Sequence, residues 1–138
     1  MIYLASDHGG YELKELISKK LKELGKEVTD VGCHSNESCD YPDYAHDACN
    51  RIEKGDLGIF VCGSGNGIQM AANSHSHIRA ALCWTPEIAE LARLHNDANV
   101  MTMPGRFISE DDALMCVLKF ISTSFEGGRH QRRVDKIK

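Results

Sequence analysis

The sequence lacks the features that mark several common functional classes. Its 138 residues contain no apolar run near the ~18 residues that a membrane-spanning helix requires. The start Met1-Ile2-Tyr3-Leu4 is typical of a strand rather than of a signal peptide. There is no Gly-Lys-Ser or Gly-Lys-Thr, which excludes a Walker phosphate loop, and a net charge of −4 gives no general attraction for nucleic acid or anionic lipid. We therefore expect a cytoplasmic protein that binds neither nucleic acid nor membranes.

Cysteine pairs suited to a metal or a disulfide are also absent. None of the six cysteines belongs to a C-x-x-C pair and no export signal accompanies them, so we expect reduced thiols. The nearest approaches to a ligand cluster are Cys33-His34 with Cys39, and His75-x-His77. Because tetrahedral zinc needs four convergent donors, we expect solvated loop residues at both places and no metal.

What the sequence does contain is a regular alternation of two patterns. Apolar runs of strand length alternate with stretches of helical period, which is typical of repeated βα units. With 42% hydrophobic residues, the chain is long enough for one domain, residues 1–138, and too short for two of ordinary size. We therefore predict an α/β protein with a three-layer α/β/α, Rossmann-like fold and a five-stranded parallel sheet. The predicted strands are residues 2–5, 27–31, 57–62, 78–83 and 99–103.

The predicted helices have recognisable ends. Thr85-Pro86-Glu87 is typical of an N-cap, a first-turn proline and an acid matched to the helix dipole, and Ser109-Glu110-Asp111-Asp112 resembles a capping box. Gly25 and Gly55 are expected to end two earlier helices. Helices are predicted at residues 13–24, 43–54, 67–72, 85–95 and 109–121. Residues 126–138 form a C-terminal tail, and Gly127-Gly128 predicts a hinge that lets it project.

The most informative segment is the run Gly63-Ser64-Gly65-Asn66-Gly67, directly after the buried strand that ends in Cys62. Three glycines let the backbone approach a ligand closely, and the helix that follows adds the positive end of its dipole. The run is not a dinucleotide fingerprint, because Ile68 and Met70 stand where further glycines would be required. It therefore predicts a cradle for a small anion or an oxyanion beside a thiol.

Further polar groups are expected at the same edge of the sheet. Asp7-His8-Gly9-Gly10 follows the first strand, and Asp40-Tyr41-Pro42-Asp43 follows the second. His95-Asn96-Asp97 precedes the fifth strand and Arg106 follows it. Open α/β sheets bind ligands at the carboxyl ends of their strands, so we expect all of these groups to converge there with Cys62.

The residues match a known family over the whole chain. The chain resembles the ribose-5-phosphate isomerases of type B, the family that also contains the subunits of galactose-6-phosphate isomerase. The resemblance rests on Asp7-His8-Gly9-Gly10, Asp40-Tyr41-Pro42, Cys62-Gly63-Ser64-Gly65-Asn66-Gly67, Ala71-Ala72-Asn73, Ile78-Arg79-Ala80-Ala81, His95-Asn96-Asp97-Ala98-Asn99-Val100 and Gly127-Gly128-Arg129-His130-Gln131-Arg132-Arg133-Val134.

The resemblance implies an aldose–ketose isomerase of the pentose phosphate pathway that needs no metal or organic cofactor. Such an enzyme interconverts D-ribose 5-phosphate and D-ribulose 5-phosphate through an enediolate. Cys62 would be the base, with its thiolate favoured by the dipole of the following helix. Some members carry a glutamate base one residue after the last cradle glycine, where this chain has Ile68, so the cysteine version is indicated.

The resemblance also assigns the remaining site residues. His95 would open the sugar ring, Asp7 would assist at the hydroxyls, and Ser64 would complete the catalytic set. The tail would serve the site of a second subunit, which implies a homodimer or tetramer with composite sites. The enediolate would be held by Gly63, Gly65, Asn66, Gly67 and Asn96, the phosphate by His8, Arg106, Arg129 and Arg133, and Tyr41 would line the substrate.

Two other functions fit the same motifs. The substrate could be a hexose 6-phosphate, such as allose or galactose 6-phosphate, because the motifs do not define the depth of the pocket. The chain could also be a silent subunit that binds a sugar phosphate without turning it over, since a fold does not determine a function.

Overall fold

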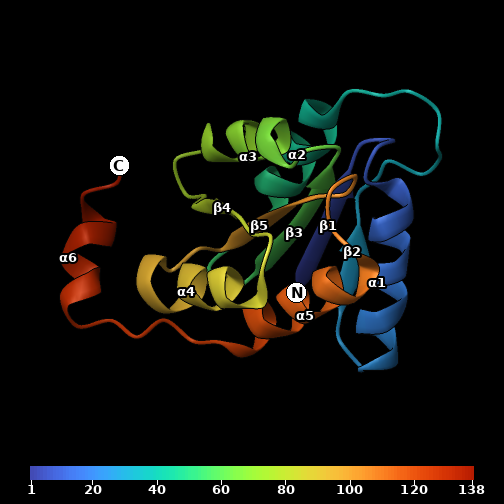
Figure 1. The fold of residues 1–138 in the computed structure, drawn as a ribbon. Coiled ribbons are helices and arrows are strands. Elements are labelled where there is room, and N and C mark those ends of the chain that lie inside the picture. Colours follow the sequence, from blue (N-terminus) through green and yellow to red (C-terminus); the bar gives the residue numbers. More distant parts are fainter.

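The computed structural model describes residues 1–138, in which strands and helices alternate as far as the last two helices (Figure 1). The fold class predicted from the sequence is confirmed: five parallel strands form one sheet between two layers of helices. The elements are β1 (Ile2–Ser6), α1 (Tyr11–Glu23), β2 (Val28–Asp30), α2 (Tyr41–Arg51), β3 (Leu57–Cys62), α3 (Asn66–Asn73), β4 (Ala80–Leu82), α4 (Pro86–Asn96), β5 (Val100–Pro104), α5 (Glu110–Ser122) and α6 (Arg129–Asp135).

The order of the strands places β3 at the centre of the sheet. The sheet runs β2-β1-β3-β5-β4. In the register of the parallel pairs, Ser6 of β1 lies beside Val61, and Cys62 lies beside Pro104 of β5. The carboxyl ends of β1, β3 and β5 are therefore level with one another, and the loops that follow them share one edge.

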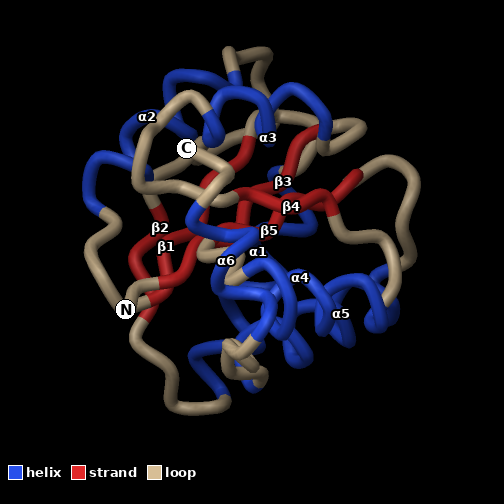
Figure 2. The backbone as a smooth tube through the Cα atoms, turned by 90° about the vertical axis from the view of Figure 1, so that its left-hand side faces the viewer, coloured by secondary structure: helices blue, strands red, loops and turns tan.

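Side chains of β3 alternate between the two faces, as expected for a strand buried on both sides. Ile59 and Val61 join the core beneath α1, α4 and α5. Phe60 and Cys62 join the core beneath α2 and α3. Figure 2 shows the strands as a layer between these two groups of helices. Cys62 therefore leaves the sheet on the α2–α3 side.

Several predicted helix ends are correct and others are shifted. The Thr85 hydroxyl accepts a hydrogen bond from the Ile88 N–H at 3.3 Å, and the Ser109 hydroxyl accepts one from the Asp112 N–H at 3.1 Å, so both predicted N-caps form. α2 covers Tyr41–Arg51 instead of residues 43–54, because the backbone turns extended at Ile52.

The C-terminal tail is attached to the body at both ends. The Glu126 N–H donates to the Leu94 carbonyl at 3.1 Å. The ammonium of Lys138 donates to the carbonyls of Asn73, His75 and Ile78 at 3.1, 2.6 and 2.6 Å. Between these anchors α6 lies outside the three layers, beside the carboxyl end of α4 (Figure 1). No helix of the chain combines the length and apolarity needed to cross a bilayer.

Candidate active site

The thiol of Cys62 is held at the start of a helix. Gly65 is the N-cap residue of α3 and takes a left-handed conformation with φ 79°. Its N–H donates to the Cys62 sulfur at 3.2 Å, and its carbonyl accepts from the Thr102 hydroxyl at 3.0 Å. The sulfur thus receives a backbone hydrogen bond and lies near the positive end of the α3 dipole.

Three other buried thiols lie in different surroundings. Burial raises the pKa of Cys49 and of Cys83 to about 12. It raises the pKa of Cys116 to about 11. These thiols remain protonated near neutral pH and serve as small core residues. All six cysteines are unpaired, so no disulfide competes for Cys62.

Two cradle glycines are required by close contacts. A Cβ added to Gly65 would lie 2.5 Å from Leu82 Cδ1 and 2.9 Å from the Met103 carbonyl carbon. A Cβ added to Gly67 would overlap the ring of Tyr41. Tyr41 therefore packs directly on the first turn of α3, and a larger residue would push the cradle and this ring apart.

The loop after β1 is folded around a buried carboxylate. Asp7 Oδ1 accepts hydrogen bonds from the Gly9 N–H at 2.8 Å and from the Gly10 N–H at 3.2 Å. Gly10 has no room for a side chain, because an added Cβ would overlap the Val61 carbonyl of the neighbouring strand. These bonds leave Asp7 Oδ2 for a ligand and bring the start of α1 against β3.

A cavity of about 340 Å³ brings these groups together. Arg106 reaches it from the loop after β5, where its N–H donates to the Gly63 carbonyl at 3.1 Å. His8 Nδ1 accepts from the Cys39 N–H at 3.2 Å, so a neutral His8 ring carries its proton on Nε2. The lining residues are Asp7, His8, Tyr41, Cys62, Gly63, Ser64, Gly67 and Arg106.

This arrangement suits a small, anionic, hydroxyl-bearing ligand. Arg106 and the Nε2–H of His8 are donors for a charged oxygen, while Asp7 accepts hydrogen bonds from hydroxyls. The thiol of Cys62 is the one nucleophilic or basic sulfur within the cavity. The volume is at the lower end of the range for ligand pockets, about 300–1,000 Å³, so the cavity fits a metabolite of a few carbons.

His95 and Asn96 do not lie at this edge, so the expected convergence is wrong for these two residues. They end α4 just before β5, whose first residue is Val100, whereas Cys62 pairs with Pro104 at the other end of that strand. Four residues of strand separate the two ends by about 13 Å. The physical reason is general: residues that precede a parallel strand lie at the amino edge of the sheet, and residues that follow it lie at the carboxyl edge.

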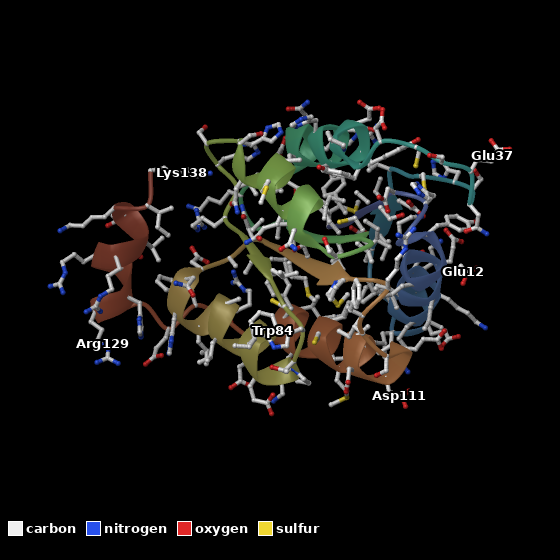
Figure 3. All side chains as sticks on the ribbon, turned by 45° about the horizontal axis from the view of Figure 1, so that its top comes forward. Glu12, Glu37, Trp84, Asp111, Arg129 and Lys138 are labelled. Carbon is white, nitrogen blue, oxygen red and sulfur yellow. The ribbon has the colours of Figure 1, made fainter.

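The basic residues of α6 are also separated from the Cys62 cavity within the chain. Arg129 lies on the outside of the molecule, at the far end from α1 (Figure 3). Arg133 is one turn further along the same helix, and its Nη1 donates to the Arg129 carbonyl at 3.4 Å. Asn96 lines a different cavity of about 590 Å³, together with Leu82 and Trp84. Arg129, Arg133 and Asn96 therefore do not reach Cys62 of their own chain.

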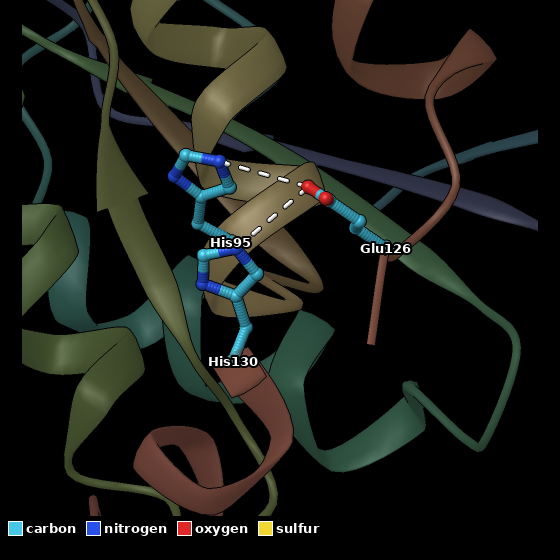
Figure 4. Close-up of side chains that lie close together, drawn as sticks. All are labelled: His95, Glu126 and His130. Atoms are coloured by element: carbon cyan, nitrogen blue, oxygen red, sulfur yellow. Dashed lines mark ion pairs between the residues drawn. The ribbon is translucent and has the colours of Figure 1, made fainter. Parts of the chain in front are cut away.

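His95 instead meets two residues for which no role was predicted from the sequence. Its ring stacks on that of His130, with centroids 4.1 Å apart and planes inclined by 13°. Glu126 Oε2 lies 3.8 Å from His95 Nε2 and 3.7 Å from His130 Nε2 (Figure 4). Glu126 precedes α6 and is separated from it by Gly127 and Gly128, both with positive φ, so helical periodicity gives no signal for this contact.

Two histidines and a carboxylate are also a common ligand set for a divalent metal. The three candidate ligand atoms all lie within 4.8 Å of one another. A metal, however, must lie close to the plane of each imidazole that binds it. Because the rings are nearly parallel and stacked, their Nε2 lone pairs run side by side and do not converge. The arrangement as folded therefore does not suit a metal.

Comparison with known proteins identifies the family. At the sequence level, the chain is 43% identical to a probable ribose-5-phosphate isomerase B of Mycoplasma genitalium, over 99% of this chain and 92% of that protein. It is 42% identical to the ribose-5-phosphate isomerase B of Escherichia coli, over 99% and 93%.

Solved structures agree with the sequence comparison. The crystal structure of a Thermotoga maritima ribose 5-phosphate isomerase superposes with a TM-score of 0.96 at 49% identity, covering 99% of this chain and 95% of that one. The Mycoplasma genitalium enzyme with bound ribulose-5-phosphate superposes with a TM-score of 0.95 at 43% identity, covering 99% and 92%. The family model for ribose/galactose isomerases matches residues 2–137, and the chain belongs to this family.

Proposed function

We propose that the protein is a ribose-5-phosphate isomerase, which interconverts D-ribose 5-phosphate and D-ribulose 5-phosphate in the pentose phosphate pathway. The observation that carries the proposal is the Cys62 thiol, held by the Gly65 N–H in a cavity that also contains Asp7 and Arg106. Relatives at 42–44% identity over nearly the whole chain bear this name. One similar enzyme has been solved with ribulose-5-phosphate bound.

The cradle supplies what the proton transfer requires. In the open-chain aldose, the Cys62 thiolate removes the proton from C2, and the electron pair forms the C1–C2 double bond of an enediolate. The same thiol then returns a proton to C1, while the hydroxyl proton moves from O2 to O1, so that the ketose results. Backbone N–H groups of the cradle and the Ser64 hydroxyl stabilise the oxyanion, for which each donor is typically worth about 10²–10³ in rate.

Within this proposal the site is completed by a second subunit. His8 and Arg106 line the cavity and bind the phosphate, but His95, Arg129 and Arg133 of the same chain are at the other end of β5 or beyond it. These residues act only if a second copy brings them to the cavity. We therefore propose a homodimer, or a tetramer built from such dimers, with composite sites. The unpaired thiols fit a reducing cytoplasm.

A coupled assay of ribose 5-phosphate isomerisation tests the proposal, with Cys62→Ala as the variant and Cys116→Ala as the control. Removal of a general base costs about 10²–10⁴ in rate, so Cys62→Ala is expected to lose nearly all turnover while still binding the sugar phosphate. Cys116 is a buried core residue of α5, and its variant is expected to stay active. Allose 6-phosphate is assayed in parallel. A preference for it would assign a hexose phosphate as the substrate instead. A wild-type protein that is inactive on both sugars would contradict the proposal.

A further inference from the structure

The group His95, Glu126 and His130 has a geometry that the proposed function does not explain by itself. Three separate parts of the chain build it: the end of α4, the loop before α6, and the first turn of α6. The loop is held in place by the hydrogen bond from the Glu126 N–H to the Leu94 carbonyl. The backbone of Glu126 is consequently held beside Leu94, the residue that precedes His95.

The two rings of the group differ in exposure. The side chain of His130 is 11% exposed, whereas that of His95 is 39% exposed. Glu126 occupies only the Nε2 edge of His95, so the Nδ1 edge is left for a ligand. His130 covers one face of the His95 ring and prevents it from turning freely.

The charges in the group favour a proton on one ring only. Two imidazolium rings stacked at 4.1 Å would repel each other strongly. Burial lowers the pKa of His130, and the neighbouring His95, Arg129 and Arg133 lower it further, although Glu126 opposes them. His130 is therefore neutral near neutral pH, and the carboxylate of Glu126 is available to a proton on His95.

We infer that Glu126 and His130 are positioning residues for His95: His130 holds the ring by stacking, and Glu126 stabilises the imidazolium that forms when His95 accepts a proton. The inference rests on the proposed function, in which His95 opens the sugar ring. The Glu126–His95 contact of 3.8 Å is an ion-pair distance. The carboxylate, 57% exposed, has room to shorten it to a hydrogen bond.

During ring opening, His95 accepts a proton and then returns it. His95 takes the proton from the anomeric hydroxyl, the electron pair left on O1 forms the C1=O1 double bond, and the bond between C1 and the ring oxygen breaks. The imidazolium then delivers its proton to the ring oxygen, which becomes the C4 hydroxyl. His95 is neutral again at the end, so Glu126 is needed only while the charge exists.

This chemistry provides a way to isolate the role of Glu126. Ribulose 5-phosphate is an open chain, because the oxygen on C5 that would close its ring is phosphorylated. Exchange of its C1 proton with solvent needs Cys62 and the enediolate but no ring opening. Conversion of ribose 5-phosphate, which is mostly a furanose, needs both steps.

The experiment compares Glu126→Gln with the wild type and with Glu90→Gln as a matched control. Glu90 is on α4 like His95 and pairs with Lys119 at the surface, at 3.0 Å. Isomerisation of ribose 5-phosphate is measured by a coupled assay. Deuterium incorporation at C1 of ribulose 5-phosphate in D₂O is measured by NMR. We expect Glu126→Gln to lower isomerisation by about 10- to 100-fold, with the exchange rate within about twofold of the wild type.

The outcomes separate the inference from the function on which it rests. Equal isomerisation by Glu126→Gln and wild type would overturn the inference and leave the function intact, and a parallel loss of both rates in a folded variant would also overturn it. A wild-type protein that neither isomerises nor exchanges would contradict the proposed function itself. His130→Phe retains a flat ring for stacking and is expected to keep most of the activity, whereas His130→Ala is expected to lose as much as Glu126→Gln; the opposite order would refute the stacking role.

Discussion

Mixing two inactive variants is expected to restore activity. Cys62→Ala removes the base from the cavity, and His95→Asn removes the imidazole at the other end of β5. Within one chain these residues belong to opposite edges of the sheet, about 13 Å apart along the strand alone. The proposed composite site takes Cys62 from one subunit and His95 from the other, so the two defects fall in different halves of each site.

The size of the effect follows from counting sites. When the two variants are produced in equal amounts and pair at random, half of the dimers are mixed. Each mixed dimer has one site with both defects and one site with none. The mixture is therefore expected to show about a quarter of the wild-type activity, and purified mixed dimers about half.

The assay requires co-expression of the two variants with different affinity tags, sequential purification over both tags, and measurement of ribose 5-phosphate isomerisation. The matched control combines Cys62→Ala with Asp7→Asn. Both of these residues line the same cavity, so every mixed dimer has two damaged cavities and no recovery is expected. Activity of the first mixture no higher than that of the parent variants would refute the composite site.

Three further predictions concern the cradle, the tail and pH. Gly65→Ala is expected to lower the free energy of unfolding by about 2–4 kcal/mol, measured by urea titration, because its Cβ meets the Met103 carbonyl carbon at 2.9 Å and its φ is positive. Lys138→Met removes three hydrogen bonds to backbone carbonyls and is expected to raise KM by about tenfold through misplacement of α6, with a smaller change in kcat. Burial and the nearby His46, His77 and Lys138 lower the pKa of His75, so its contribution to stability is present above its ordinary pKa of about 6.5 and is lost as the pH falls through the lowered value. Urea unfolding from about pH 8 to about pH 5 is expected to show this loss in the wild type, and a smaller loss in His75→Gln.

The fold was predictable where burial alone decides the structure. The run from Leu57 to Cys62 is apolar throughout because β3 is covered on both faces, and its limits are correct. β4 is shorter than predicted, Ala80–Leu82 instead of residues 78–83. The reason is a side chain distant in sequence: the amide of Asn73 bonds both the N–H and the carbonyl of Ala80, at 2.8 and 2.9 Å, and defines where the edge strand begins. Local patterns do not contain that information.

The site was predictable for those residues that directly follow a strand. Asp7, Cys62 and Arg106 each follow a strand, and the carboxyl-edge rule brings them to one cavity. The same rule, applied to His95 before β5, places it at the opposite edge, so this error was avoidable from the sequence. The contact of His95 with Glu126 and His130 was not predictable, because it depends on the path of the irregular segment between α5 and α6.

In the proposed mechanism, the two reaction steps depend differently on dimer formation, because their groups lie at opposite ends of β5. In the proposed mechanism, proton transfer relies on Cys62 and on the groups after β1 and β5, which one chain brings to one cavity. Ring opening, in the same proposal, relies on His95 with Glu126 and His130, which the chain holds together at the other end of β5. In the proposed dimer, dissociation would therefore stop ring opening and weaken phosphate binding, while each cradle would remain folded. Loss of activity on dilution should then be steeper for ribose 5-phosphate isomerisation than for C1 exchange of ribulose 5-phosphate at saturating substrate, because only the first reaction needs the second subunit's imidazole.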